Sequence, residues 1–411
     1  MGNPFLERVP NSLPDGGRTD NFPAMQTPSA FKAPVRLLMG PGPSNVAPAV
    51  LQALSQPLVG HLDPVFVKMM EELKAMLRAV FLTQNEMTFP VSGTGSAGME
   101  FCFVNLIEPG DEVIVGVNGV FGTRMVEVAE RCGARVTKVE STWGNIITPQ
   151  QVVEALKTVP KPKLVAIVHA ETSTGALTPV EEISKLVHDA GALLLLDTVT
   201  SLGGCPVRID EWNVDAVYSG TQKCLSCPPG LAPVSLNARA LEVARRRRTK
   251  VQSWYLDVNL LASYWGQERV YHHTAPISMN YGLHAALRLA LEEGLENRWR
   301  RHKQNHLALK SALGAIGLEI ASQEGHQLWQ LNAIRVPSGV DEAEVRKRLL
   351  NEFNLEVGAG LGPLKGKIWR VGLMGETSTR ENVRLFLTAF CQMLNECGRK
   401  TDTKAALAAL E

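Results

Sequence analysis

Two residues that could do chemistry stand at the ends of apolar runs. Lys223 follows the small polar residues 219–222, just beyond the apolar run 216–218. A lysine in a partly dry site can lose its proton and attack a carbonyl carbon, forming a Schiff base. Asp197 ends the apolar run 192–196, where a carboxylate is costly to keep charged without a cationic partner. Each has an ordinary alternative, since most lysines are not nucleophiles and Asp197 could simply cap the next turn.

A glycine-rich stretch and one arginine add two further signals. Residues 92–98 read Ser-Gly-Thr-Gly-Ser-Ala-Gly and precede the helix-like residues 99–103. Free N–H groups in the first turn of a helix attract phosphate, although this stretch fits neither the dinucleotide nor the Walker pattern. Arg370 lies in an apolar run, where a guanidinium suits bidentate recognition of a carboxylate. A structural salt bridge would explain Arg370 equally well.

Together, the four signals match the needs of pyridoxal phosphate. This cofactor requires a phosphate cradle, a lysine for its aldehyde, a carboxylate that keeps its pyridine nitrogen protonated, and an arginine for the carboxyl group of an amino acid. No dehydrogenase or kinase needs that set. Ligands of open α/β sheets lie beyond the carboxyl ends of the strands, so we expect the four signals to meet there.

The elements that position these residues alternate between strand-length apolar runs and capped helices. Strands are expected at residues 112–117, 135–138, 163–169, 192–197 and 216–219. Helices are expected to start at Asp63, Thr148 and Thr178, the last two with a capping box and a proline at the first helical position. The alternation predicts an α/β fold whose mainly parallel sheet is covered by helices on both faces.

Changes in composition along the chain suggest two domains and two terminal segments. Residues 1–38 are predicted to be an N-terminal arm, 39–295 a large cofactor-binding domain, 296–400 a smaller C-terminal α+β domain, and 401–411 a tail. A long helical stretch follows Pro276, and Gly294 and Gly314 are expected to interrupt it. The smaller domain should hold strands at 328–336, 355–357 and 368–373 and helices from Asp341 and Thr379.

Charge and cysteine content limit the possible partners. Of 411 residues, 42 are Lys or Arg and 41 are Asp or Glu, so the net charge is 42 − 41 = +1, which disfavours a nucleic-acid partner. No apolar run approaches the roughly 18 residues that cross a membrane. Seven scattered cysteines, an odd number, indicate a reducing, cytoplasmic location. Cys224 and Cys227 form a CxxC pair that nothing completes into a metal site, so we predict buried thiols and no metal.

On these residues the sequence resembles the class V aminotransferases of fold type I, in particular the alanine:glyoxylate and serine:glyoxylate aminotransferase group. The similarity runs from about Leu38 to Leu394. The stretches that carry it are 40–45, 92–98, 118–122, 171–175, 219–223 with 228–230, 271–274, and 360–363 with 369–372. The resemblance implies a large domain built on a seven-stranded, mainly parallel sheet.

The resemblance also implies a role for each site residue. Lys223 would hold pyridoxal phosphate and shuttle the proton, Asp197 would pair with the pyridine nitrogen, and Arg370 would bind the carboxylate of the substrate. The phosphate would be surrounded by Thr94, Gly95, Ser96 and Gln222, and by Tyr271 and Thr274 from the other subunit of a homodimer. The ring would be held by Phe121 and Val199 on its two faces and by Thr172 near its hydroxyl group.

The implied reaction is transamination from alanine or serine to glyoxylate, giving a 2-keto acid and glycine by a ping-pong mechanism. A donor such as 3-hydroxykynurenine or ureidoglycine remains an alternative, as does a non-catalytic scaffold of the same fold. Cysteine desulfurase is disfavoured because Gln222 stands where that enzyme usually has a histidine. Two residues depart from the animal alanine:glyoxylate enzymes, which generally have tryptophan at Phe121 and histidine at Ser96.

Overall fold

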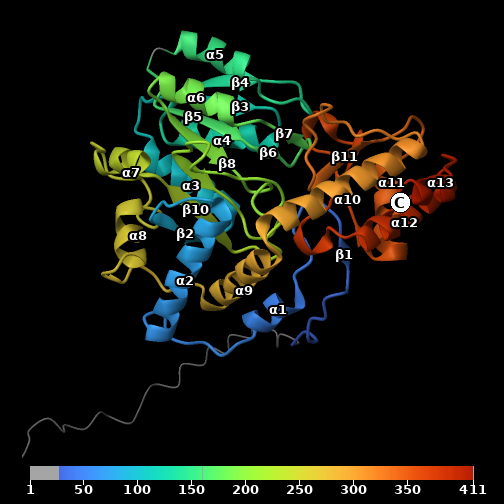
Figure 1. Ribbon diagram of the computed structural model, residues 1–411, viewed down its shortest axis with the longest axis horizontal. Helices are drawn as coiled ribbons and strands as arrows, with labels where there is room; N and C mark the ends of the chain where they lie inside the picture. Colours follow the sequence, from blue (N-terminus) through green and yellow to red (C-terminus); the bar gives the residue numbers. More distant parts are fainter. Residues whose placement is uncertain (1–26, 160, 411) are drawn as a thin grey trace, which may run out of the picture. The chain divides into compact units, whose positions relative to one another are not determined.

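The computed structural model describes residues 27–159 and 161–410. Its helices are α1 (Pro48–Leu54), α2 (Pro64–Phe81), α3 (Gly95–Leu106), α4 (Val120–Arg131), α5 (Pro149–Thr158), α6 (Glu181–Asp189), α7 (Ala238–Arg245), α8 (Val258–Trp265), α9 (Ile277–Glu293), α10 (Leu295–Ala315), α11 (Glu342–Phe353), α12 (Arg380–Glu396) and α13 (Thr403–Ala408). Its strands are β1 (Leu37–Leu38), β2 (Met87–Ser92), β3 (Glu112–Val117), β4 (Arg135–Glu140), β5 (Leu164–Val168), β6 (Ala170–Glu171), β7 (Ala176–Leu177), β8 (Leu193–Asp197), β9 (Ala216–Tyr218), β10 (Leu231–Leu236), β11 (Leu331–Arg335), β12 (Leu355–Glu356), β13 (Gly358–Ala359) and β14 (Ile368–Gly372). Figure 1 shows their arrangement.

A seven-stranded sheet of order β2-β10-β9-β8-β5-β3-β4 forms the centre of the fold. All of its strands run parallel except β10, which is antiparallel to both neighbours. The predicted α/β class and the five predicted strands are confirmed. Strands β2 and β10 were not expected from the sequence, because each contains a proline, Pro90 in β2 and Pro233 in β10, that weakens a strand pattern. These two prolines face each other in the register of the pair.

Burial of both faces of the sheet explains the apolar run that ends at Asp197. Along β8, Leu193 and Leu195 pack with the cluster that includes α3, α4, α7 and α8. Leu194 and Leu196 point the other way and pack with α1, α5, α6 and α9. Since side chains alternate across a strand, a strand covered on both faces shows no alternation of polarity.

Two predicted helix starts had different outcomes. At Thr148 the capping box is present, with Gln151 N donating to Thr148 Oγ1 over 3.3 Å and Thr148 N donating to Gln151 Oε1 over 2.9 Å. At Thr178 the prediction was wrong, because α6 begins at Glu181 without a side-chain cap. The N–H of Thr178 instead donates to His169 O over 2.9 Å, which extends the hairpin of β6 and β7 and keeps this residue outside the helix.

The C-terminal elements have a hydrophobic core of their own. The three-stranded sheet β11-β14-β13 packs with α11, α12, α13 and the second half of α10. Gly294, at φ +80°, separates α9 from α10 as predicted, whereas Gly314 lies inside α10 and does not interrupt it. Figure 1 shows α10 passing from the central sheet to this C-terminal core. Helix α10 packs on both cores, since Leu295 contacts the core of the central sheet and Leu309 lies in the C-terminal core. The domain boundary predicted at residue 295 stays a prediction.

The predicted terminal segments contain some regular structure. Residues 1–26 of the predicted arm lie outside the described residues, and residues 27–36 hold no helix or strand. Leu37 and Leu38 form β1, which pairs in parallel with β12. In the predicted tail, α13 buries Ala406 against the C-terminal core.

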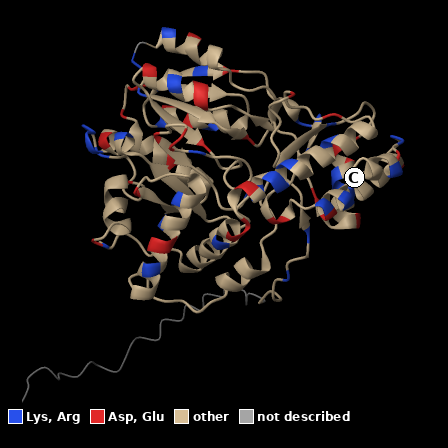
Figure 2. Cartoon of the chain, viewed as in Figure 1, with Lys and Arg blue, Asp and Glu red and all other residues tan. Residues whose placement is uncertain are grey.

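Residues of both charge signs are intermixed along the chain in Figure 2. No helix among residues 27–159 and 161–410 is both long enough and apolar enough to span a bilayer. In the same residues, no group of three or more His, Cys, Asp and Glu side chains could hold a metal ion.

Candidate active site

A cavity of about 220 Å³ lies where the carboxyl ends of β8 and β9 meet the first turns of α3 and α4. This is the sheet edge at which ligands of α/β proteins bind. The cavity brings together these residues of the predicted site: Thr94, Gly95, Ser96, Phe121, Asp197, Val199, Gln222 and Lys223. It is also lined by three residues that the sequence analysis missed: Met99, Arg124 and Tyr218.

Asp197, the last residue of β8, presents a buried carboxylate to the cavity. Its side chain accepts hydrogen bonds from Val199 N over 2.8 Å and from the Tyr218 hydroxyl over 2.7 Å. Burial raises the pKa of Asp197 to about 7, although both donors oppose that shift. Within the described residues this carboxylate is bonded by these two neutral donors and forms no ion pair. The position therefore suits a positively charged group of a ligand, as the sequence analysis expected.

Tyr218 is placed beside Asp197 by the sheet itself. The two residues are partners in the parallel register of β8 and β9. Tyr218 is fully buried, and its carbonyl accepts hydrogen bonds from the N–H and the hydroxyl of Thr198, each over 2.9 Å. A tyrosine at the end of the strand next to Asp197 was a usable signal once the strand order was known.

Lys223 reaches the same cavity from the loop after β9. Burial, together with the charge of Arg370, lowers the pKa of its amine to about 8, against the opposing charges of Cys224 and Asp197. The amine donates to Pro41 O. A lysine with a lowered pKa is more often neutral near pH 7, which is the form that attacks carbonyl carbons.

The segment 40–44 closes over Lys223. Gly42 has φ +107°, and a Cβ on it would lie 2.5 Å from Lys223 Nζ, so only glycine fits at this position. The Ser44 hydroxyl donates to Lys223 O over 2.8 Å. These contacts fix both the backbone and the side chain of the lysine.

A buried arginine holds the loop after Lys223 from the other side. Arg298, near the start of α10, donates from Nε to Gly203 O over 3.1 Å and from Nη2 to Cys224 O over 2.5 Å. Its charge is compensated by Glu293 at 2.6 Å. The helix that leads to the C-terminal core thus contacts the residue that follows the lysine.

The glycine-rich stretch places the first turn of α3 at the cavity. The N-cap residue Thr94 gives no side-chain cap to α3, so the first N–H groups are available to an anion. Gly98 is needed for close packing, since a Cβ there would lie 2.9 Å from Ala232 Cβ and 3.1 Å from Tyr218 Cβ. Gln222 Oε1 is buried as well and has no hydrogen-bond partner within the part of the chain that the structure describes.

Phe121, in the first turn of α4, faces the cavity together with Arg124. The guanidinium of Arg124 lies over the Phe121 ring, 5.2 Å from its centroid. Arg124 follows Phe121 by three residues and Met99 follows Ser96 by three, so helical periodicity would have found both residues.

Arg370 and Thr172 lie next to the cavity but do not line it. Arg370, on β14, is only 7% exposed and donates to Ala359 O over 2.6 Å and to Thr172 O over 3.3 Å. Burial lowers its pKa to about 10, and the charge of Glu171 opposes this shift. Within the described residues, Arg370 bonds these two carbonyls and no carboxylate, so the structural salt bridge weighed as an alternative is not found there. The hydroxyl of Thr172 bonds that of Thr200.

Tyr271 and Thr274 are not part of the cavity. Both side chains are exposed, Tyr271 by 58%, and its ring centroid lies 5.2 Å from that of His61. The chain described here does not bring them to its own predicted phosphate site.

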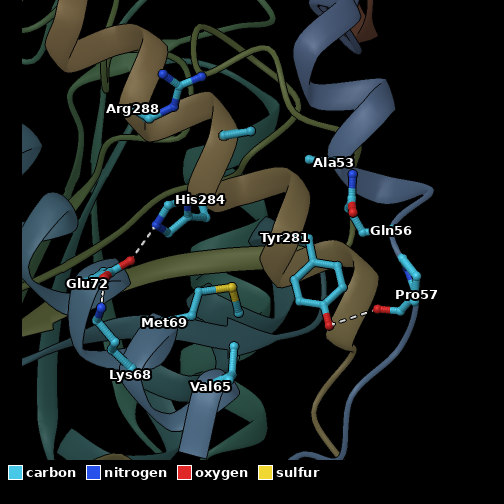
Figure 3. A pocket seen from close by; sticks show the side chains of 11 residues that line it. Ala53, Gln56, Pro57, Val65, Lys68, Met69, Glu72, Tyr281, His284 and Arg288 are labelled. Atoms are coloured by element: carbon cyan, nitrogen blue, oxygen red, sulfur yellow. Dashed lines mark hydrogen bonds and ion pairs between the residues drawn. The ribbon is translucent and has the colours of Figure 1, made fainter.

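A second hollow, shown in Figure 3, lies between α1, α2 and α9. In it the Tyr281 hydroxyl donates to Pro57 O over 3.2 Å, and His284 Nε2 lies 2.8 Å from Glu72 Oε2. It contains none of the predicted site residues.

The residues of the first cavity fit pyridoxal phosphate. An uncapped helix start suits a phosphate, and within the described residues the buried carboxylate of Asp197 has no cationic partner for its charge. Residues 37–384 match the family described as aminotransferase class-V. The chain belongs to the class-V aminotransferases. Pyridoxal phosphate is the cofactor of this family.

Relatives of this class-V aminotransferase share most of its length. The (S)-ureidoglycine–glyoxylate transaminase of Bacillus subtilis is 40% identical over 374 residues, which cover 87% of this chain and 89% of the relative. The alanine–glyoxylate aminotransferase of Rattus norvegicus is 41% identical over 368 residues, 89% of each chain. The crystal structure of alanine–glyoxylate aminotransferase from Nostoc sp. has 49% identity and a TM-score of 0.89, covering 92% of this chain and all of that one.

Proposed function

We propose that this class-V aminotransferase transfers the amino group of a small amino acid, alanine or serine, to glyoxylate, releasing a 2-keto acid and glycine. The observation that carries the proposal is the joint presence of Lys223 and Asp197 on one cavity. Burial shifts the two pKa values toward each other, to about 8 and about 7. A non-catalytic scaffold would have no use for such a pair. Relatives named for glyoxylate support the choice of acceptor.

Lys223 is the proposed proton shuttle. When bound, pyridoxal phosphate links to an amine and withdraws electrons from the adjacent Cα–H bond. The Lys223 amine, partly neutral near pH 7, can take the proton from the substrate Cα. Its contacts with Pro41 and Ser44 hold it at this position.

Asp197 is proposed to pair with the protonated pyridine nitrogen. Its raised pKa means that a nearby positive charge is needed to keep the carboxylate ionised. Tyr218 and Val199 N orient the two oxygens. Phe121 and Val199 would cover the two faces of the ring, and Thr172 would hydrogen-bond near its hydroxyl group. Thr94, Gly95, Ser96 and Gln222 would bind the phosphate.

Arg370 is proposed to bind the substrate carboxylate. Its guanidinium is buried and held by two backbone carbonyls, so it is oriented without being neutralised. A planar guanidinium can bind a carboxylate through two parallel hydrogen bonds.

A screen of donors and acceptors tests this function. Alanine and serine with glyoxylate should give glycine with parallel double-reciprocal plots, which indicate a ping-pong mechanism. Ethylamine has the amine of alanine but no carboxylate, so Arg370 would leave it a poor donor. If neither alanine nor serine is used, and (S)-ureidoglycine or 3-hydroxykynurenine supports turnover, the proposed donor is wrong. Inactivity with every amino acid would refute transamination.

We also infer that the active form is a homodimer. The family resemblance places Tyr271 and Thr274 at the phosphate of the partner subunit, and both are exposed in the single chain. Large apolar side chains are also exposed: Leu51, Leu58, Leu62, Val65, Trp254 and Val270. Of these, Val65 lines the hollow of Figure 3. Light scattering should give twice the mass of one chain, and a monomer with full activity would refute the inference.

A cytoplasmic location is proposed on the state of the thiols. All seven cysteines are free, and six of them are buried. Free thiols persist in reducing compartments. Fractionation that recovers the chain in an oxidising compartment would contradict this proposal.

A further inference from the structure

A buried carboxylate that the proposed mechanism does not use lies behind the cavity. Glu171, the last residue of β6, is fully buried. Its Oε1 accepts hydrogen bonds from Ser173 N over 3.0 Å and from Ser173 Oγ over 2.5 Å. Its Oε2 accepts from Phe121 N over 3.2 Å and from Gly122 N over 3.4 Å. The side chain therefore joins β6 to the first turn of α4.

Glu171 and Ser173 replace the missing cap of α4. The N-cap residue of this helix is Gly119, which has no side chain to accept a hydrogen bond. The N–H of Val120 donates to Ser173 Oγ over 3.0 Å, and the next two N–H groups donate to Glu171. Burial raises the pKa of Glu171, and the hydrogen bonds from Ser173 and from these two N–H groups oppose that rise. The ionised carboxylate is stabilising at this end of a helix because the helix dipole is positive there.

The sequence keeps the space that this contact needs. A Cβ on Gly119 would lie 2.3 Å from Glu171 Cδ and 2.4 Å from Ser173 Oγ. Glycine at 119 thus supplies no side-chain cap of its own, and its lack of a Cβ leaves room for Glu171 and Ser173 to cap the helix.

We propose that Glu171 is a positioning residue that fixes the first turn of α4, and with it Phe121, against the cofactor ring. This inference rests on the proposed function, in which Phe121 covers one face of that ring. Phe121 is both the residue whose backbone N–H Glu171 accepts and a residue whose side chain lines the cavity. Loss of the hydrogen bond from Phe121 N to Glu171 would let the backbone of residue 121 move. The Phe121 ring would then tilt, because its position is set by the same Cα atom.

The same carboxylate acts on the substrate side of the cavity. Thr172 follows Glu171 directly, and its carbonyl accepts a hydrogen bond from Arg370 Nη1 over 3.3 Å. The negative charge of Glu171 also opposes the lowering of the pKa of Arg370 by burial. Glu171 favours the charged guanidinium without pairing with it directly, which leaves that group available for a substrate carboxylate.

Glu171→Gln is the variant that tests the inference. The amide keeps the size of the side chain but turns one acceptor into a donor facing N–H or O–H groups. In the cofactor-free protein, the amides of residues 120–122 should exchange hydrogen faster than in the wild type. The dissociation constant for pyridoxal phosphate should rise by about tenfold or more, as expected for loss of a charged hydrogen-bond acceptor. The visible circular dichroism per bound cofactor should also fall, because it reports the setting of the ring.

Glu127→Gln is the matched control, since Glu127 lies on the same helix, is exposed and, among the described residues, forms its one ion pair with Arg131. It should match the wild type in all three measurements. Wild-type exchange, affinity and dichroism in Glu171→Gln would overturn the inference. If Glu171→Gln does not fold, Ser173→Ala decides: faster exchange at Val120 with weaker cofactor binding supports the inference, and wild-type behaviour overturns it.

The wild type separates this inference from the proposed function. A wild type that does not bind pyridoxal phosphate would refute the proposed function itself. If the wild type binds the cofactor and transaminates, and Glu171→Gln equals it in exchange, affinity and dichroism, only the positioning role is refuted.

Discussion

Lys223→Ala is expected to lower the rate of multiple turnover to less than about a thousandth of the wild-type value, in line with the loss of an acid–base group. Lys223 is the one amine that lines the cavity, within the residues the structure describes. The methyl side chain of the variant can neither attack the cofactor aldehyde nor move the proton at the substrate Cα. Steady-state kinetics with alanine and glyoxylate provide the measurement.

Lys157→Ala serves as the control for that variant, because Lys157 is exposed and pairs with Glu154 on the surface of α5. Its rate should equal that of the wild type. Lys223→Ala should also keep the fold, since the carbonyl that accepts from Ser44 belongs to the backbone. Near-normal turnover in a folded Lys223→Ala variant would show that another residue does the chemistry.

Asp197→Asn should lower kcat by about 10- to 150-fold, the equivalent of a charged hydrogen bond of about 1.5 to 3 kcal/mol. The amide keeps the shape of the side chain, and its single oxygen can accept from the Tyr218 hydroxyl while its NH2 group faces Val199 N. The amide carries no negative charge that would keep the pyridine nitrogen protonated. The cofactor ring would then withdraw electrons from the Cα–H bond less strongly. An unchanged kcat with full cofactor occupancy would remove Asp197 from the mechanism.

The pH dependence of stability gives an independent check on Asp197. Burial raises its pKa from 3.8 to about 7, so the folded cofactor-free chain holds a proton that the unfolded chain releases. The free energy of unfolding therefore falls as the pH rises from about 4 to about 7. The asparagine of Asp197→Asn does not titrate, so the variant does not lose this free energy of unfolding. The melting temperature of Asp197→Asn minus that of the wild type should therefore rise from about pH 4 to about pH 7. A constant difference would contradict the raised pKa.

The sequence was sufficient for those parts of the fold that depend on local patterns. The unbroken apolar run before Asp197 predicted a strand buried on both faces, and the capping box at Thr148 predicted a helix start. Prediction failed where long-range contacts decide. Thr178 has the same local pattern, yet its N–H pairs with His169 in a hairpin. Pro90 and Pro233 lowered the strand signal of β2 and β10, which pair with each other.

The site residues, too, could be predicted where a local pattern marks them and were missed where long-range contacts decide. Lys223 and Asp197 stood out because their residue types are unusual at the ends of apolar strands, and both line the cavity. Tyr218 was missed because its role depends on β9 lying next to β8, which no local pattern reveals. Glu171 was missed as well, since its partners Phe121 and Gly122 are about fifty residues away in the chain.

The central claim is that the Lys223 amine binds pyridoxal phosphate in the cavity that contains Asp197. Borohydride reduction of the protein with bound pyridoxal phosphate, followed by proteolysis and mass spectrometry, tests it most directly. Our account predicts that the cofactor is fixed to the peptide containing Lys223, in a ratio of about one per chain, with no other lysine labelled to a comparable extent. Stable labelling of a different lysine, with Lys223 unmodified, would contradict it.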